Sequence, residues 1–300
     1  MTQFWIGQIV QGVLLGGYYA LLACGLSFMF GVMRIINLAH GSIAVLAAFL
    51  VLTVAGQWNL SPFLALLAIV PVMAIAGWLL QRGVLDRALR AGELTPLLST
   101  FGLAIVIDNL LFERYGADTR SLAPNVGDLA YSSWTAGGLS VGELALLTFA
   151  VAVALLGGLH LFLHRTPFGR AIRATAQDAD TAELVGVDSR AVYAGASAIA
   201  LVTVAIAGAF LGLRSSFDPY AGATQLIFAF EAVVIGGTGS LWGTLLGGIV
   251  LGVAQNVGSQ VNPQGFLIGG HVVFLLVLAA RFALGGRDLR ALVRPVRRTT

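Results

Sequence analysis

The chain has 300 residues, of which 58% are apolar and only 10% are charged. Soluble domains are about 45–50% apolar and about 25% charged, so this composition excludes an ordinary soluble domain and indicates an integral membrane protein. All 17 basic residues are arginine, which excludes enzymes that need a P-loop lysine for ATP or a lysine for a Schiff base.

Long, mostly apolar runs separated by short polar segments predict an all-α polytopic membrane protein. A helix that crosses a bilayer needs about 20 mostly apolar residues. Eight runs approach or reach this length, at residues 6–30, 38–54, 62–80, 94–112, 141–163, 191–213, 241–258 and 266–284. A further run, residues 225–236, is shorter, so we expect a re-entrant, tilted or broken segment there.

The junction between the first two runs holds polar groups where two membrane segments meet. It contains Arg34, Asn37 and His40, followed by Gly41. In hydrocarbon an unsatisfied polar group is costly, so these side chains must face protein, a water-filled cavity or the headgroup layer. The junction is either an interfacial turn in which Arg34 reaches the headgroups, or a broken helix beside a translocation pathway.

Two carboxylates lie inside apolar runs, Asp108 in the fourth run and Glu231 in the short one. Ionisable groups in the membrane usually face a bundle interior or a cavity. Asp108 also fits an outer interfacial position, whereas Glu231 has no nearby polar end, and a pairing with Arg34 or His40 would neutralise it. The candidate pathway residues are Asn37, His40, Gly41 and Glu231.

Residues 164–190 form a polar insertion with strong helix signals. Thr166 fits a helix N-cap with Pro167 at the first helical position, and Gly186 fits the position just past the end. Asp180 and Glu183 stand at capping-box spacing, so two short helices with a bend near Asp178 are expected. One face is apolar and could dock on a protein or on the membrane; it carries Ala171, Ala174, Ala182 and Val185.

Arginines follow the third and fifth runs and end the chain in a basic tail, residues 285–300. Cytoplasmic loops carry an excess of arginine, so these three regions are expected in the cytoplasm, with residues 115–140 as a long outer loop and the amino terminus outside. The arginines are scattered between apolar runs and not gathered on one surface. No nucleic-acid partner is therefore expected.

Glycines recur at every fourth position in several runs. The pairs are Gly12 with Gly16, Gly208 with Gly212 and Gly248 with Gly252, and a triplet lies at Gly239, Gly243 and Gly247. Small residues at this spacing let membrane helices approach to backbone contact. Close helix packing is the expected role of these glycines.

Three stretches carry a resemblance that covers the chain nearly end to end. They are GLSFMFGVMRIINLAHG at residues 25–41, GRAIRATAQDADTAELVGV at residues 169–187 and AFEAVVIGGTGSLWGTLLGGIVLG at residues 229–252. In this order they resemble the permease subunits of branched-chain amino acid ABC transporters, whose close relatives carry urea and short-chain amides. One departure is Phe282 after Arg281, where many relatives have proline.

The resemblance implies one transmembrane permease domain, residues 1–300, in an importer of branched-chain amino acids in the bacterial inner membrane. It implies a subunit that is not an enzyme and holds no cofactor, because ATP would be bound by partner subunits. The implied partners are a second homologous permease subunit, two ABC ATPase subunits, a periplasmic substrate-binding protein and membrane lipid. Residues 164–190 would couple the subunit to the ATPases, through Gly169, Arg170, Arg173, Ala174, Asp178 and Glu183.

Two alternatives remain at this stage. A permease for urea or short-chain amides would carry the same motifs. An autonomous transporter coupled to protons through Asp108 and Glu231, or a membrane enzyme subunit, belongs to a different class, and no relay of ionisable groups along one run and no catalytic spacing supports it. The four histidines, among them His160 and His164, and the single cysteine, Cys24, lack metal-site spacing, so no metal is expected.

Overall fold

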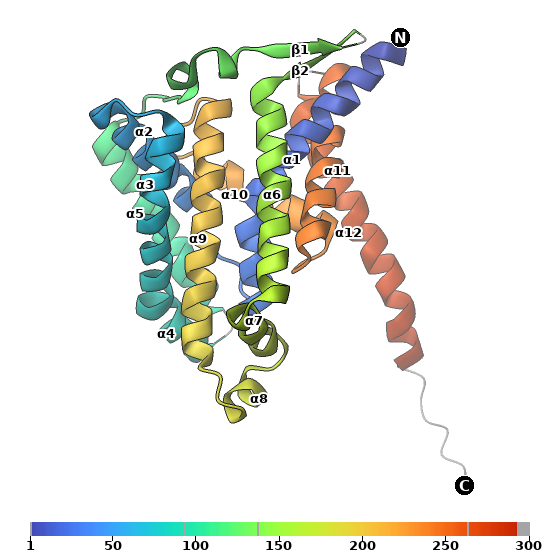
Figure 1. Ribbon diagram of the computed structural model, residues 1–300. Helices are drawn as coiled ribbons and strands as arrows, with labels where there is room; N and C mark the ends of the chain where they lie inside the picture. The colour runs from blue at the N-terminus through green and yellow to red at the C-terminus, as the bar shows by residue number, and fades with distance from the viewer. Residues whose placement is uncertain (1, 93, 137, 263, 293–300) are drawn as a thin grey trace.

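The computed structural model describes residues 2–92, 94–136, 138–262 and 264–292, and it shows a bundle of long helices (Figure 1). Within these residues, eight helices are long and apolar enough to cross a membrane, which confirms the all-α polytopic prediction. They are α1 Thr2–Met33, α2 His40–Trp58, α3 Pro62–Leu80, α5 Thr95–Tyr115, α6 Glu143–Arg165, α9 Ser189–Arg214, α11 Leu241–Val261 and α12 Gly265–Leu292. Residues 293–300 of the predicted basic tail lie outside the described residues.

Shorter elements cover the two ends of the bundle. At one end, a π-helical turn at Gln81–Leu85 joins α3 to α4 Asp86–Ala91, and α7 Pro167–Gln177 is followed by α8 Ala179–Leu184. At the other end lie a 3₁₀ segment, Ala123–Ala130, and an antiparallel hairpin of β1 Ser133–Ala136 and β2 Leu139–Gly142. Figure 1 shows this hairpin and the α7–α8 pair at opposite ends, as the arginine pattern predicts.

Helix α1 lies at the centre of the bundle and contacts α6, α9, α10 and α11. Its residues 20–24 are completely buried. A helix that is apolar on all sides is suited to such an interior position. The uncharged first run of the sequence therefore becomes the element around which the others pack.

Glycines set the closest helix contacts, as their spacing predicts. Gly12 and Gly16 of α1 face Gly252 and Gly248 of α11, and a Cβ at Gly252 would lie 2.6 Å from the Gly16 nitrogen. No side chain fits in such a space. The α1–α11 crossing is thus held by backbone contact, the form of packing that works in lipid, where the ordinary hydrophobic drive is absent.

The short apolar run becomes α10, Gly222–Gly236, which has 15 residues. At about 1.5 Å per residue it spans about 22 Å, less than the roughly 30 Å of a hydrocarbon core. The non-helical segment before it carries Phe217, which packs on Phe49 of α2. After α10 the chain turns back, and Gly236 packs against Gly243 of α11. The run therefore forms a helix too short to cross the hydrocarbon core alone, and this helix makes a helical hairpin with α11.

The orientation can be tested with single cysteines in a Cys24→Ala background, because Cys24 is completely buried. A cysteine at Thr135 in β1 is expected to react with a membrane-impermeant maleimide added to intact cells. A cysteine at Asp180 in α8 is expected to react only after the cells are permeabilised. Labelling of both positions from the same side would contradict the fold and its orientation.

Candidate functional site

The chain breaks between α1 and α2, at residues 34–39. Arg34 follows the last residue of α1 with φ of 58°, a left-handed conformation that is uncommon for a residue other than glycine. Its amide still donates to the Phe30 carbonyl at 2.9 Å, and its side chain is exposed. Arg34 thus ends α1 and turns the chain, while its charge stays at the surface.

Asn37 organises the turn that follows. Its side-chain oxygen accepts a hydrogen bond from the Ala39 amide at 3.0 Å, and its carbonyl accepts one from the His40 amide at 3.1 Å. The Leu38 amide donates to the Thr100 hydroxyl of α5, also at 3.0 Å. Three backbone amides that no helix satisfies therefore have partners inside the protein, which the low-dielectric interior requires.

His40 joins this turn to the central helix. Its Nε2 lies 2.7 Å from the Leu22 carbonyl of α1, so Nε2 carries the proton and donates. The Nδ1 atom is buried and has no hydrogen-bond partner within the described part of the chain. Asn37 and His40 are both fully buried, so they shape the bend and do not face a cavity.

Gly41 places the first turn of α2 against the first turns of α10. A Cβ at Gly41 would overlap the Gly222 carbonyl oxygen and would lie 2.8 Å from the Leu226 nitrogen. From the other side, a Cβ at Gly222 would lie 2.7 Å from the Ser42 Cα. The bend therefore brings two helix backbones into direct contact.

Glu231 of α10 pairs with His271 of α12. The His271 Nδ1 lies 2.5 Å from Glu231 Oε1, and the Glu231 side chain is only 4% exposed. The sequence-based pairing with Arg34 or His40 is wrong, because His40 bonds to the Leu22 carbonyl and Arg34 is exposed. His271 carried no sequence signal beyond being a lone imidazole in the last apolar run.

A groove lies along α10, and we call it the α10 groove. Its volume is about 390 Å³. It is lined by Ile36 and Leu38 beside the bend, Leu97 of α5, Leu226 and Phe230 of α10, Phe274 of α12, and Glu231. Glu231 thus lies near the segment that contains Asn37, but neither Asn37 nor His40 is among the residues that line the groove.

Two tyrosines of α1 donate hydrogen bonds to glutamine side chains, and none of these four residues was singled out from the sequence. The Tyr18 hydroxyl donates to the Gln225 side chain of α10 at 2.7 Å. The Tyr19 hydroxyl donates to the Gln255 side chain of α11. The only signal for these residues was a glutamine inside each apolar run. These bonds fix α10 and α11 against the central helix.

Asp108 of α5 is half-buried, and its carboxyl group interacts with the Ser42 side chain of α2. Ser42 belongs to the first turn of α2, next to Gly41. Asp108 and Glu231 therefore have separate partners on separate helices.

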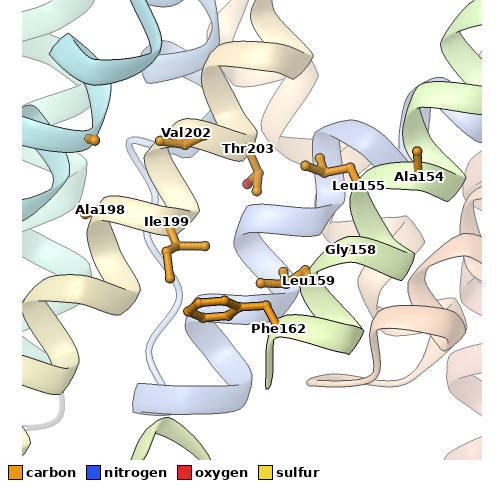
Figure 2. Close-up of a pocket in the computed structure, with 10 residues that line it drawn as sticks. Ala154, Leu155, Gly158, Leu159, Phe162, Ala198, Ile199, Val202 and Thr203 are labelled. Atoms are coloured by element: carbon orange, nitrogen blue, oxygen red, sulfur yellow. The ribbon is translucent and has the colours of Figure 1, made fainter. Parts of the chain in front are cut away.

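A second groove lies between α6 and α9, with a volume of about 370 Å³ (Figure 2). One wall of this groove is formed by Leu155, Leu159 and Phe162 of α6, and the facing wall by Ile199 and Val202 of α9. Thr203 of α9 contributes a hydroxyl group to the lining. That hydroxyl already donates to the Ala200 carbonyl at 2.7 Å. Apart from this hydroxyl, the side chains that line the groove are apolar, and no ionisable group lies among them, in contrast to Glu231 in the α10 groove.

The predicted helix pair is present at the α7–α8 segment. Thr166 caps α7 by accepting a hydrogen bond from the Gly169 amide at 2.9 Å, and Pro167 opens the helix. A Cβ at Gly169 would lie 2.6 Å from the Leu163 Cα, so α7 packs tightly on the end of α6. Gly186 has φ of 89° and follows the pair, as expected.

The cap of α8 corrects one prediction. Asp178, and not Asp180, is the N-cap, because Asp178 has the extended backbone that a cap requires and accepts a hydrogen bond from the Thr181 amide at 3.1 Å. Hydrogen bonds from the Thr181 hydroxyl and amide lower the pKa of the Asp178 carboxyl. The cap is therefore ionised at neutral pH, and the predicted bend lies at Asp178.

The predicted apolar face of this helix pair is divided between the protein interior and the surface. Ala182 is buried against the protein, whereas Val185 is 77% exposed and Leu184 is 87% exposed. Ala174 is also exposed, so Ala174, Leu184 and Val185 are among the uncovered apolar positions of the segment. The charged residues predicted to couple the segment to a partner, Arg170, Arg173, Asp178 and Glu183, are exposed as well, and Gly169 is buried.

Residues 8–280 match the model of the family described as the branched-chain amino acid transport system permease component. The chain is 31% identical over 268 residues to the high-affinity branched-chain amino acid transport system permease protein BraD of Pseudomonas aeruginosa, covering 86% of this chain and 87% of BraD. No solved structure matches the chain.

Two further relatives extend this similarity. The permease protein LivH of Escherichia coli (strain K12) is 29% identical over 271 residues, covering 85% of this chain and 86% of LivH. A probable branched-chain amino acid transport permease protein of Methanocaldococcus jannaschii is 28% identical over 303 residues, covering 96% of this chain and 95% of that protein. The similarity spans nearly the whole length of each protein.

The contact at Gly41 predicts a loss of stability on enlargement. We expect Gly41→Leu to lower the thermal unfolding temperature of the purified protein in detergent, because overpacking typically costs about 1–3 kcal/mol. Gly56→Leu is the matched control, since a Cβ at Gly56 in the same helix meets nothing within 4 Å. Equal unfolding temperatures for the two variants would contradict the α2–α10 contact.

Proposed function

Because the chain belongs to the family of branched-chain amino acid transport system permease components, we propose that it imports branched-chain amino acids across a bacterial inner membrane. The match over residues 8–280 is the observation that carries this proposal. The chain is a multi-pass transmembrane permease subunit and not an enzyme. Permeases of ABC importers work with ATPase subunits and a substrate-binding protein.

The substrate class is supported by two independent features. The relatives named above are described as branched-chain amino acid permeases. The wall of the α10 groove is built from leucine, isoleucine and phenylalanine side chains, which suit a branched aliphatic side chain. Urea and short amides offer little apolar surface to such a wall, so they are the less favoured cargo.

We place the pathway at the α10 groove, between this chain and a second homologous permease. The groove is open on one side, and Ile227, which also lines it, is 48% exposed. A partner permease would cover that side and turn the groove into a channel wall. Asn37, His40 and Gly41 would hold the bend behind this wall, and Glu231 would face the cargo.

The α7–α8 segment would be the docking element for the ATPase subunits. It packs against α1, α6 and α9, so movement of the segment reaches the helix that ends at the bend. Exposed apolar positions, Ala174, Leu184 and Val185, are available to a partner groove, and exposed arginines flank them. ATP would be bound by two partner ATPases, and the permease itself would hold no cofactor.

The coupling role is tested by Ala174→Asp in the complete reconstituted transporter. A charge buried in the docking contact is expected to lower both transport and the stimulation of ATP hydrolysis by loaded binding protein, since an unpaired buried charge is strongly destabilising. Capture of substrate by the binding protein alone should not change.

The control makes the same change in the other cytoplasmic segment, at the exposed Ala91 of α4. Ala91→Asp is expected to leave stimulated hydrolysis near the wild-type rate. Loss of coupling in Ala91→Asp with normal coupling in Ala174→Asp would move the docking site to α4 and contradict the proposal.

A further inference from the structure

Glu231 has one oxygen in use and one without a partner. Oε1 accepts a hydrogen bond from His271, while Oε2 is buried and has no hydrogen-bond partner among the residues that the structure describes. A buried carboxylate oxygen without a donor is unfavourable, because the water that it loses is not replaced. The arrangement therefore favours any state in which a donor reaches Oε2.

The surroundings of Glu231 define what that donor can be. The side chains beside it in the α10 groove are apolar, including Leu226 and Phe230 of α10 and Phe274 of α12. The groove volume, about 390 Å³, lies in the range of about 300–1,000 Å³ that is typical of small-molecule sites. A ligand that fits both features has a cationic donor next to an aliphatic body.

We propose that Glu231 and the α10 groove form a transit site for the ammonium group and side chain of an aliphatic amino acid. The ammonium would donate to Glu231 Oε2, and the aliphatic side chain would pack against Phe230 and Phe274. This inference rests on the proposed function and adds a specificity-determining residue to it. Cargo without a positive charge, such as urea, a simple amide or a sugar, could donate only a neutral hydrogen bond to Oε2 and would leave the carboxylate charge unneutralised, so it would be selected against.

His271 acts as a positioning residue in this site. Its Nδ1 holds Oε1 at 2.5 Å and so restricts the orientation of the carboxylate. The imidazole is 44% exposed, which gives it room to follow a rotation of the Glu231 side chain. In the proposed site, such a rotation would bring Oε2 to the groove.

The site is tested by Glu231→Gln in the complete transporter, reconstituted in liposomes with its ATPases and binding protein. Loss of the negative charge is expected to reduce the maximal rate of leucine uptake about tenfold or more, since hydrogen bonds to charged groups are stronger than neutral ones. The apparent KM should stay unchanged, because the binding protein sets capture. Glu231→Asp should restore part of the rate.

Two controls separate the possible failures. Glu113→Gln removes an exposed carboxylate from α5 and should transport at the wild-type rate. If the wild-type complex imports no branched-chain amino acid, the proposed function fails. If the wild type imports leucine and Glu231→Gln matches it, the transit site alone is overturned. A matching loss of unfolding temperature in Glu231→Gln and Glu231→Asp would also overturn it, in favour of a purely structural pair.

Discussion

Inside a bilayer, every backbone donor must find a partner within the protein, and the break at residues 34–39 depends on this constraint. Asn37 satisfies the amides of Ala39 and His40, and Thr100 satisfies that of Leu38. His40 then ties the bend to the Leu22 carbonyl of the central helix. These bonds allow α2 to begin inside the bundle, and the rest of the candidate site follows from where α2 begins.

The position of α2 fixes α10, and α10 carries Glu231. Contact between Gly41 and Gly222 brings the first turns of both helices together, and the glycine contact of Gly236 with Gly243 folds α10 onto α11. The packing of Phe217 on Phe49 and the Tyr18–Gln225 hydrogen bond hold the amino-terminal end of α10 in place. The result is a short helix that presents Glu231 beside an apolar groove. α7 packs at the carboxyl end of α1, next to the same bend, so a movement of the α7–α8 segment would act there.

Much of the fold could be predicted from the sequence, because hydrophobic run length fixes helices in a membrane. Thr166, Pro167 and Gly186 likewise marked the α7–α8 pair by local rules of helix capping. The partner of Glu231 could not be predicted, since His271 is 40 residues away in the chain and the pairing depends on how α10 and α12 pack. The prediction that Asp180 caps α8 was wrong because the cap depends on the extended backbone of Asp178, and residue spacing alone does not reveal that backbone conformation. The division of Ala174 from Ala182 depends on how α8 packs, and so it also needed the structure.

The central claim is that the α10 groove is a wall of the translocation pathway, covered by a second permease. The most direct measurement is the reaction of a single cysteine at Ile227 with a water-soluble, membrane-impermeant thiol reagent in the assembled transporter. The account predicts that the rate of labelling changes between the nucleotide-free and the ATP-trapped complex, and that excess transported amino acid slows it. A cysteine that reacts in no state with the water-soluble reagent, but reacts with a lipid-soluble one, would show that the groove faces lipid and would contradict the account.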